Sequence, residues 1–315
     1  MAGQSVGERG EFALIETITA GLPGGPHLVL GTGDDCAVFR PDGDVAVSTD
    51  TMVENVHFRR DWSSAHDVGR KAVAAAVSDL EAMGARPLVL VMSLSTPPEV
   101  EVAWVQEFSA GVREECGNAS ILLAGGDTTR SRDITITATV LGDLQGRAPV
   151  TRAGARPGDV VAFAGRLGWA AAGVKVLGRG FRSPRAVVVA HRVPEPPYGQ
   201  GIAAAQAGAS AMIDVSDGLL ADLGHIARAS GVAINIDTAT LDVAEPQSVV
   251  AAAVGGGNPQ TFILTGGDDH ALAATFAPDD VPDGWTVIGT VLDGEPAVTV
   301  DGAPWEGEQG WSHFG

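Results

Sequence analysis

Acidic side chains recur along the chain in short segments that also contain glycine, serine or threonine. These segments are "GTGDD" at 31 to 35, "STDT" at 48 to 51, "GGDT" at 125 to 128, "DVSD" at 214 to 217 and "GGDD" at 266 to 269. Two carboxylates about 4 Å apart repel by about 4 kcal/mol at an effective dielectric constant of 20, so a converging group requires bound cations. Ligands that are all oxygen suit Mg²⁺ or Mn²⁺ better than Zn²⁺. The pattern therefore predicts a metal-dependent site.

The first segment, "GTGDD", looks like the start of a phosphate-binding loop because it follows the apolar run "HLVL". Cys36 takes the place of the third glycine, and "CAVF" follows where a phosphate-binding loop would begin a helix. Asp34 and Asp35 would repel an anion. The loop therefore binds no phosphate, or binds it through cations whose charge is offset by Asp35, Asp50, Asp79 and Asp127.

Each acidic segment also has a purely structural interpretation. Asp and Gly favour turns, and Ser216 or Asp217 could cap a helix that starts at Gly218. Asp79 lies on the apolar face of a predicted helix, where an uncompensated carboxylate is costly. Because acidic turns follow strand after strand, a shared metal site explains the pattern better than a series of separate turns.

The elements that must position these residues alternate along the chain. Apolar runs and period-two alternation predict strands at 27–30, 44–49, 87–95, 121–126, 133–142 and 160–165. Helical spacing predicts a helix over 66–83, and the most regular helix of the second half over 211–231. This alternation predicts the α/β (α+β) class. A stretch rich in glycine and proline at 146–159 predicts a boundary near residue 148, which gives domains 1–148 and 149–315.

Composition excludes several classes of protein. The chain has 315 residues, 45% of them hydrophobic, which is enough for two packed domains. With 39 acidic and 20 basic residues the net charge is −19, which argues against nonspecific binding to nucleic acid or anionic membranes. The two lysines, Lys71 and Lys175, lie outside any loop of the Walker type, and HRD and DFG tripeptides are absent, so a P-loop enzyme and a protein kinase are excluded.

Cysteines and targeting signals agree with an intracellular protein. Cys36 and Cys116 are isolated thiols without the CxxC spacing of a metal or redox site. The first 15 residues lack the pattern of a signal peptide, and no apolar run of about 18 residues occurs. We therefore expect a cytoplasmic protein that does not bind membranes.

Eight blocks in fixed order carry a resemblance to a known family. They are "GTGDDCAVF", "VSTDTMVENVHF", "SDLEAMGARP", "GGDTTRS", "TRAGARPGD", "IDVSDGLLADLGHI", "LTGGDDHAL" and "GWSHF". In this order they resemble the thiamine-monophosphate kinase family, which belongs to the superfamily of aminoimidazole-ribotide synthetase, selenophosphate synthetase and the hydrogenase-maturation dehydratase. The resemblance implies a two-domain fold like that of aminoimidazole-ribotide synthetase, each domain a mixed sheet covered by helices. It also implies ATP-dependent phosphorylation of thiamine monophosphate to thiamine diphosphate.

The resemblance assigns roles to individual residues. Domain 1–148 would bind ATP and metal and form a homodimer, and domain 149–315 would complete the ATP and substrate site. Several Mg²⁺ ions would be held by Asp35, Ser48, Thr49, Asp50, Asp79, Asp127, Asp214 and Asp217. The catalytic carboxylates would be Asp50, Asp79, Asp127 and Asp217. ATP would contact Gly126, Asp127, Arg152 and Ser216, and the acceptor would contact His57, Asp268 and Trp311.

The chain departs from the family pattern at two places. Where the family usually has "GGED" followed by an aromatic residue and a glutamate, this chain has "GGDDHA". Asp268 therefore replaces a glutamate, and His270 and Ala271 depart further. A tyrosine common in the family near Ser109 is absent as well. We therefore expect the geometry of acceptor binding and of the adenine contacts to differ from the usual pattern.

The implied chemistry needs no strong base, because the phosphate oxygen of the acceptor is largely ionised near neutral pH. The site must align two polyanions, which favours direct in-line transfer assisted by magnesium. One alternative is another ATP-dependent enzyme of the superfamily, above all one like aminoimidazole-ribotide synthetase. The cysteines expected of the selenium and hydrogenase enzymes, near the N-terminus and in "GWSHFG" respectively, are missing. A noncatalytic acidic metal-binding protein is the alternative from another class.

Overall fold

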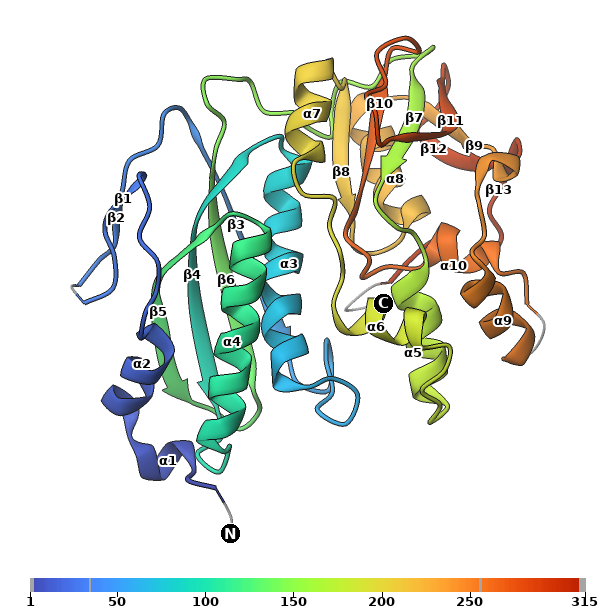
Figure 1. Ribbon diagram of the computed structural model, residues 1–315. Coiled ribbons are helices and arrows are strands. Elements are labelled where there is room, and N and C mark those ends of the chain that lie inside the picture. The colour runs from blue at the N-terminus through green and yellow to red at the C-terminus, as the bar shows by residue number, and fades with distance from the viewer. Residues whose placement is uncertain (1–2, 34, 255–256, 312–315) are drawn as a thin grey trace. The chain divides into compact units, whose positions relative to one another are not determined.

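The computed structural model describes residues 3–33, 35–254 and 257–311, which form two compact units (Figure 1). Unit 1 contains the chain up to Leu80 together with Ala85–Arg147, and unit 2 contains Glu81–Gly84 together with the chain from Ala148 onward. Each unit is a sheet with helices packed against it, so the predicted fold class is confirmed. The division of roles between the two domains stays a prediction.

Unit 1 is built on a four-stranded sheet with the order β3-β6-β4-β5. The strands are β3 (Val45–Val53), β4 (Arg86–Thr96), β5 (Leu122–Arg130) and β6 (Thr135–Asp143), and only the β4–β5 pair is parallel. The helices are α1 (Val6–Arg9), α2 (Glu11–Thr19), α3 (Ala65–Ala82) and α4 (Val102–Asn118). A short hairpin pairs β1 (Leu28–Leu30) with β2 (Val38–Phe39). The predictions of β1, β3, β4, β5 and β6 and of the helix over 66–83 are confirmed, with ends shifted by a few residues, whereas β2 was not predicted.

The two faces of this sheet differ in composition. Side chains alternate between faces along a strand, and Ile136, Ala138 and Val140 of β6 are buried on the face that α3 and α4 cover (Figure 1). On the other face, Val47 is 66% exposed, and threonine hydroxyls pair across the strands, as in the bond of 3.0 Å between Thr49 and Thr139. We call this second face the open face of the sheet.

Helix α3 is held tightly against α4. A Cβ at Gly111 of α4 would overlap the carbonyl oxygen of His66, and one at Gly69 of α3 would overlap the carbonyl oxygen of Phe108. Glycine at both positions therefore lets the two backbones approach closely. An ion pair of 2.7 Å between Arg70 Nε and the buried carboxylate of Glu115 also joins the helices. These contacts fix the position of α3, the helix that carries Asp79.

Asp143, at the end of β6, is a fully buried carboxylate that ties the sheet to its flanking loops. It accepts hydrogen bonds from the main-chain N–H groups of Asp42 and Gln145, at 2.9 and 2.7 Å, and from the guanidinium of Arg86 at 3.1 Å. Burial alone would raise the pKa of Asp143, but the N–H donors and the positive charge of Arg86 lower it overall. Asp143 therefore stabilises the fold in its ionised form.

Asp143→Asn is expected to lower the free energy of unfolding by about 2 to 4 kcal/mol at pH 7, because Arg86 loses its buried counter-charge. Since the pKa of Asp143 is lower in the folded than in the unfolded chain, its stabilisation is present above about pH 4 and is lost as the pH falls through the lowered pKa. Urea unfolding at pH 7 and near pH 3 measures both effects. The control is Asp133→Asn, at an exposed position, and an equal loss in both variants would contradict the prediction.

Unit 2 is built on a seven-stranded sheet with the order β13-β12-β9-β11-β7-β10-β8. Its strands are β7 (Val160–Ala164), β8 (Ala211–Val215), β9 (Ala233–Ile236), β10 (Ala271–Phe276), β11 (Thr286–Leu292), β12 (Ala297–Val300) and β13 (Ala303–Pro304). Its helices are α5 (Trp169–Gly178), α6 (Arg185–Arg192), α7 (Gln200–Ala207), α8 (Leu219–Ser230), the 3₁₀ helix η1 (Thr238–Thr240), α9 (Glu245–Ala253) and α10 (Gln260–Thr265). Among these described strands, β12 and β9 pair in parallel and the other neighbours pair antiparallel.

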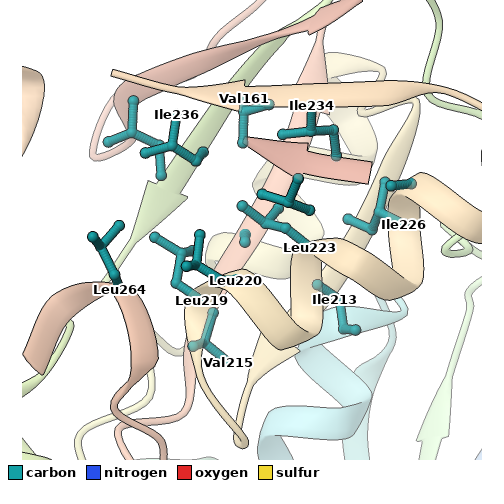
Figure 2. Packing of buried hydrophobic residues seen from close by; sticks show 14 of the residues in the cluster. Val161, Ile213, Val215, Leu219, Leu220, Leu223, Ile226, Ile234, Ile236 and Leu264 are labelled. Carbon is teal, nitrogen blue, oxygen red and sulfur yellow. The ribbon is translucent and has the colours of Figure 1, made fainter. Parts of the chain in front are cut away.

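The central strands of unit 2 are buried on both faces. Along β7, Val161 joins the core beneath α8, whereas Ala162 and Ala164 join a second core on the opposite face. Figure 2 shows α8 contributing Leu219, Leu220, Leu223 and Ile226 to the first core, opposite Val161, Ile234 and Ile236 of the strands. Strands covered on both faces lack polar alternation, which is why "VVAFA" reads as a continuous apolar run.

The single helix predicted over 211–231 is wrong in its first part. Residues Ala211–Val215 form strand β8, which pairs with β10, and α8 begins only at Leu219. A short apolar run cannot be distinguished from a buried helical segment by periodicity alone, and here its pairing with β10 decides the outcome. The correction matters for function, because it places the acidic "DVSD" segment at the end of a strand and in the turn that leads to a helix.

The two cysteines lie in contrasting surroundings. Cys36 is exposed in the β1–β2 hairpin, and Cys116 is buried in α4. Burial, reinforced by the neighbouring charge of Glu115, raises the pKa of Cys116 to about 12. In the part of the chain that the structure describes, no helix is both long and apolar enough to cross a bilayer.

Candidate active site

Strand β3 and helix α3 bring together three of the predicted oxygen ligands. Ser48 Oγ donates a hydrogen bond of 2.5 Å to Asp79 Oδ2. Asp50 lies two residues beyond Ser48 on the same strand, so its side chain leaves the same, helix-covered face. A hydroxyl and two carboxylates therefore belong to one side of the sheet, as a site for a hard cation requires.

Thr49 lies on the other face of the sheet from these residues. As the residue between Ser48 and Asp50, it projects onto the open face, where its hydroxyl shares a hydrogen bond with that of Thr139. The side chain of Thr49 is thus not brought together with those of Ser48 and Asp50. Of the three metal ligands predicted in β3, Thr49 is the one that the side-chain geometry of a single chain does not support.

Asp127 lies far from Asp50 within one chain. β3 and β5 are the two edges of the sheet, separated by three strand spacings, or about 14 Å. Asp127 pairs in register with Ser93, and it borders the cavity between the sheet and helices α2 and α4. One chain therefore does not bring Asp127 to the carboxylates of β3 and α3.

Gly126 has a structural reason to be glycine. A Cβ at this position would overlap the carbonyl oxygen of Met92 on the neighbouring strand, whereas one at Gly125 would meet open space. The main chain of both residues borders an apolar cavity of about 60 Å³ between the sheet and helices α2 and α4. The cavity is lined mainly by Ile15, Ile18, Leu22, Met92, Leu94, Phe108, Ser109, Val112 and Leu123.

His57 lies in the turn after β3 with one ring nitrogen engaged. The main-chain N–H of Val53 donates a hydrogen bond of 3.0 Å to His57 Nδ1. Nδ1 is therefore unprotonated, and in the neutral ring the proton is on Nε2. Asp35 lies in the exposed loop of the β1–β2 hairpin. Asp34 and residues 312–314 of the "GWSHF" block lie outside the described residues.

In unit 2, Asp214 lies near the end of β8, and Ser216 and Asp217 lie in the turn between β8 and α8. Asp222, from the first turn of α8, reaches back to accept hydrogen bonds from the N–H groups of Asp217 and Gly218, at 3.1 and 3.0 Å. The pKa of Asp222 is raised to about 7, first by burial and then by the charges of Asp214 and Asp217, against the opposing hydrogen bonds from Gly218 and Asp217. The turn thus gathers three carboxylates close enough to interact.

Asp222 is a site residue that sequence reasoning missed. Asp222 is indicated by its place as an acidic residue in the first turn of a helix that starts at glycine, because a carboxylate there can accept hydrogen bonds from the exposed N–H groups. Because Asp222 accepts these bonds, the capping role considered for Ser216 or Asp217 is filled by Asp222. This observation leaves the structural interpretation of the "DVSD" segment weaker and the functional one stronger.

The loop that carries Asp268 is hydrogen-bonded to this acidic turn. Asp268 N–H donates to the carbonyl of Ser216 at 2.8 Å, and His270 N–H donates to that of Val215 at 3.1 Å. Between them, the buried Asp269 accepts a bond of 2.9 Å from Ala170 N–H, and burial raises the pKa of Asp269 to about 7. The predicted acceptor carboxylate therefore lies beside the predicted metal and nucleotide residues.

Trp311 and Arg152 lie around the same turn of unit 2. The main-chain N–H of Trp311 donates to the carbonyl of Asp217 at 2.9 Å, and its side chain is 63% exposed. The pKa of His225 is lowered by burial first and then by Arg228 and Arg152, while Asp217 opposes the shift. Arg152 and Asp217 thus lie within electrostatic reach of one histidine.

The residues present fit a hard cation by the chemistry of their donors. Every predicted ligand supplies oxygen, and Ser48 and Asp79 already bring two oxygens within 2.5 Å. Within the described ranges of one chain, however, no three side chains of His, Cys, Asp or Glu converge as a finished metal site.

Comparison with known proteins agrees with this architecture. Residues 33–144 match the N-terminal domain of AIR synthase related proteins, and residues 156–301 match their C-terminal domain. The fold and the acidic turns therefore define the class as AIR synthase related proteins.

Full-length relatives narrow this class. The chain is 47% identical over 307 residues to the thiamine-monophosphate kinase of Mycobacterium tuberculosis, covering 97% of this chain and 92% of the relative. It is 37% identical to that of Corynebacterium glutamicum, with 99% and 96% covered. The solved complex of AaThiL with AMPPCP and TMP is 33% identical with a TM-score of 0.79, and 98% of each chain is covered. The chain belongs to the thiamine-monophosphate kinase family.

Proposed function

We propose that this protein phosphorylates thiamine monophosphate to thiamine diphosphate with the γ-phosphoryl group of ATP. The observation that carries the proposal is the pair of main-chain hydrogen bonds between the "DVSD" turn and the "GGDD" loop. These bonds fix the candidate metal and nucleotide residues beside the candidate acceptor carboxylate, so that two phosphorylated substrates can meet there. The kinship to AaThiL, solved with AMPPCP and TMP, supports the choice of substrates.

Magnesium is proposed as the cation that lets an acidic protein bind two polyanions. Bound Mg²⁺ neutralises phosphate charge and orients the reacting groups. The side chains that would hold it are Asp35, Ser48, Asp50, Asp79 and Asp127 in unit 1, and Asp214 and Asp217 in unit 2, with Thr49 as a further candidate through its main chain. Arg152 would add a fixed positive charge for the phosphates, and its planar guanidinium suits their oxygens.

Direct in-line transfer is the mechanism proposed for the phosphoryl step. The acceptor phosphate already carries an ionised oxygen as nucleophile, so a covalent enzyme intermediate would solve no problem. The hydrogen bond from Val53 N–H to His57 Nδ1 supports this, because it orients Nε2–H of the neutral ring as a donor. A donor at that position suits binding of the acceptor and does not suit nucleophilic attack on ATP.

The nucleotide base is proposed to enter the apolar cavity beside Gly125 and Gly126. Its walls supply methyl and aromatic groups, and the glycine main chain supplies hydrogen-bonding groups at one border. Ser109, the position near which the family usually has a tyrosine, is buried and donates to the carbonyl of Val105 at 2.8 Å. The adenine would therefore contact aliphatic side chains and Phe108 in this cavity.

A homodimer through unit 1 is proposed for two reasons. The open face exposes Val45, Val47 and Val91 on a mostly antiparallel sheet, which is the kind of surface that a second sheet covers. Asp50 and Asp127 also lie on the two strands that form opposite edges of that sheet. A partner sheet offers its own β5 edge to the β3 edge of the first chain, so a symmetric dimer supplies the missing carboxylate twice.

One experiment tests the function. Release of ADP from ATP is measured with and without thiamine monophosphate in the presence of Mg²⁺, and thiamine diphosphate is identified as the product. We expect ADP release that depends on thiamine monophosphate. Dependence on an aminoimidazole-ribotide precursor instead would favour the superfamily alternative, and binding of Mg²⁺ without any ADP release would favour a noncatalytic metal-binding protein.

Trp311→Ala is expected to raise KM for thiamine monophosphate about tenfold and to change KM for ATP by less than about twofold. The exposed indole can stack on the cationic thiazolium ring of the acceptor, a contact worth about 1 to 2 kcal/mol. Steady-state kinetics with each substrate varied in turn measures both constants. Trp311→Phe keeps an aromatic face and should lie between the parent and the alanine variant. Equal increases in the two KM values would contradict the stacking role.

A further inference from the structure

Asp268 lies between two imidazole rings in unit 2. Its Oδ2 is 3.5 Å from Nδ1 of His191, and its Oδ1 is 3.9 Å from Nε2 of His270. The other nitrogen of His270, Nδ1, is 3.3 Å from Oδ2 of Asp214. Each oxygen of Asp268 therefore faces a different ring, and one of these rings also contacts the candidate metal carboxylate.

The members of this cluster differ in their access to solvent. The side chain of Asp268 is 35% exposed, whereas those of His191 and His270 are 7% and 10% exposed. Asp268 is therefore the member of this cluster that is most accessible to a dissolved molecule, and both imidazoles are largely shielded from solvent. The rings are placed to act on Asp268 rather than on a ligand.

The backbone that presents Asp268 is held in an uncommon conformation. Asp268 has φ of 69° and His270 has φ of 52°, in the left-handed region that non-glycine residues rarely adopt. The bonds from their N–H groups to Ser216 and Val215 and the buried carboxylate of Asp269 hold the loop in this form. Backbone strain that several surrounding contacts maintain is found most often where a side chain must point in one direction.

Helix α6 fixes the second ring just as firmly. A Cβ at Gly173 of α5 would lie 2.7 Å from Cβ of His191 and would overlap the carbonyl oxygen of Val187. The backbones of α5 and α6 are therefore in close contact at the turn that carries His191. The imidazole is thus positioned by packed main chain and not by a flexible loop.

We propose that His191 and His270 are positioning residues that hold the Asp268 carboxylate in place for the acceptor, thiamine monophosphate. This inference rests on the function proposed above. Asp268 is one methylene shorter than the glutamate usual in the family, so its carboxylate stays close to its main chain, where both rings reach it. A carboxylate fixed before binding loses less conformational freedom when the acceptor binds. Contacts of 3.5 and 3.9 Å are longer than hydrogen bonds, and such contacts commonly shorten in the substrate complex.

Three variants at His191 separate positioning from packing. The amide nitrogen of asparagine occupies the place of Nδ1, the atom that faces Asp268, whereas that of glutamine occupies the place of Nε2, and leucine offers neither. His191→Leu and His191→Gln are expected to raise KM and the dissociation constant for thiamine monophosphate about tenfold, with KM for ATP within about twofold. His191→Asn is expected to stay within about threefold of the parent for all three constants.

The outcomes are distinguishable. Steady-state kinetics and calorimetric titration with thiamine monophosphate supply the constants, and thermal unfolding shows which variants fold. Should His191→Leu not fold, the comparison of asparagine with glutamine decides alone. With an active parent, any of three results overturns the inference. The first is an unchanged KM and dissociation constant for thiamine monophosphate in the glutamine variant, and the second is parallel changes for both substrates. The third is an asparagine variant that binds thiamine monophosphate no better than the glutamine variant. If the parent shows no ADP release that depends on thiamine monophosphate, the proposed function is wrong and the inference that rests on it is wrong as well.

Discussion

Asp50→Asn is expected to lower kcat by at least about 100-fold. The change keeps the size of the side chain and removes one of the negative charges that the proposed magnesium ions require, on the face of β3 where Ser48 bonds to Asp79. It should also abolish most of the rise in melting temperature that Mg²⁺ with a nonhydrolysable ATP analogue gives the parent. Steady-state kinetics and thermal unfolding with and without these ligands measure the two effects.

The matched control for this variant is Asp44→Asn. Asp44 is an exposed acidic residue immediately before β3, and its change removes the same charge a few residues from Asp50. The control should keep both the activity and the ligand-induced shift of the parent. An Asp50→Asn variant that turns over and binds like the control would mean that the metal site lies elsewhere.

Mixing two inactive variants is expected to restore about a quarter of the parental activity. If Asp50 of one subunit works with Asp127 of its partner, a heterodimer of Asp50→Asn and Asp127→Asn has one site with both changes and one intact site. Random assortment of equal amounts makes half of all dimers heterodimers, so about a quarter of all sites are intact. Co-expression of the two variants, purification as mixed dimers and measurement of kcat per site test the expectation.

A second mixture serves as the control. Asp79 lies on the same side of the sheet as Asp50 in one chain, so Asp50→Asn mixed with Asp79→Asn leaves every site with one change. This mixture should stay inactive. Recovery in both mixtures, or in neither, would contradict a site shared between Asp50 of one subunit and Asp127 of the other.

The sequence predicted the strands of unit 1 well, and the reason is local. In β3 and β6, polar and apolar residues alternate because one face of the sheet is covered by helices and the other is open. The same period also separates Ser48 and Asp50 from Thr49, whose hydroxyl bonds to Thr139 on the open face. A period-two reading of "STDT" could therefore have set Thr49 apart from the other proposed ligands.

The relation between distant acidic segments could not be predicted in this way. Nothing local in "STDT" or "GGDT" says that their strands form the two edges of one sheet, because strand order depends on pairing between segments far apart in the chain. The order β3-β6-β4-β5 is what separates Asp50 from Asp127. Gly126 is similar, since its need for glycine comes from the carbonyl of Met92 on a neighbouring strand.

The cluster around Asp268 also depends on tertiary structure. His191 lies 77 positions before Asp268 in the sequence, in an otherwise unremarkable basic and apolar helix, and no motif connects them. His270 was visible only as a departure from the usual family pattern. Packing of α6 against α5 and the turn at Asp268 bring the two rings to the carboxylate, and both depend on contacts that sequence spacing does not encode.

The contrast between the two thiols makes the hairpin loop accessible to spectroscopy. Thiol reagents react with the thiolate, so a maleimide dye at neutral pH should label exposed Cys36 and leave Cys116, with its pKa of about 12, unmodified. Cys36 follows Asp35 directly in the chain. A fluorophore placed there would report on the environment of that loop as cations and nucleotide are added, in the natural sequence and without engineering a labelling position.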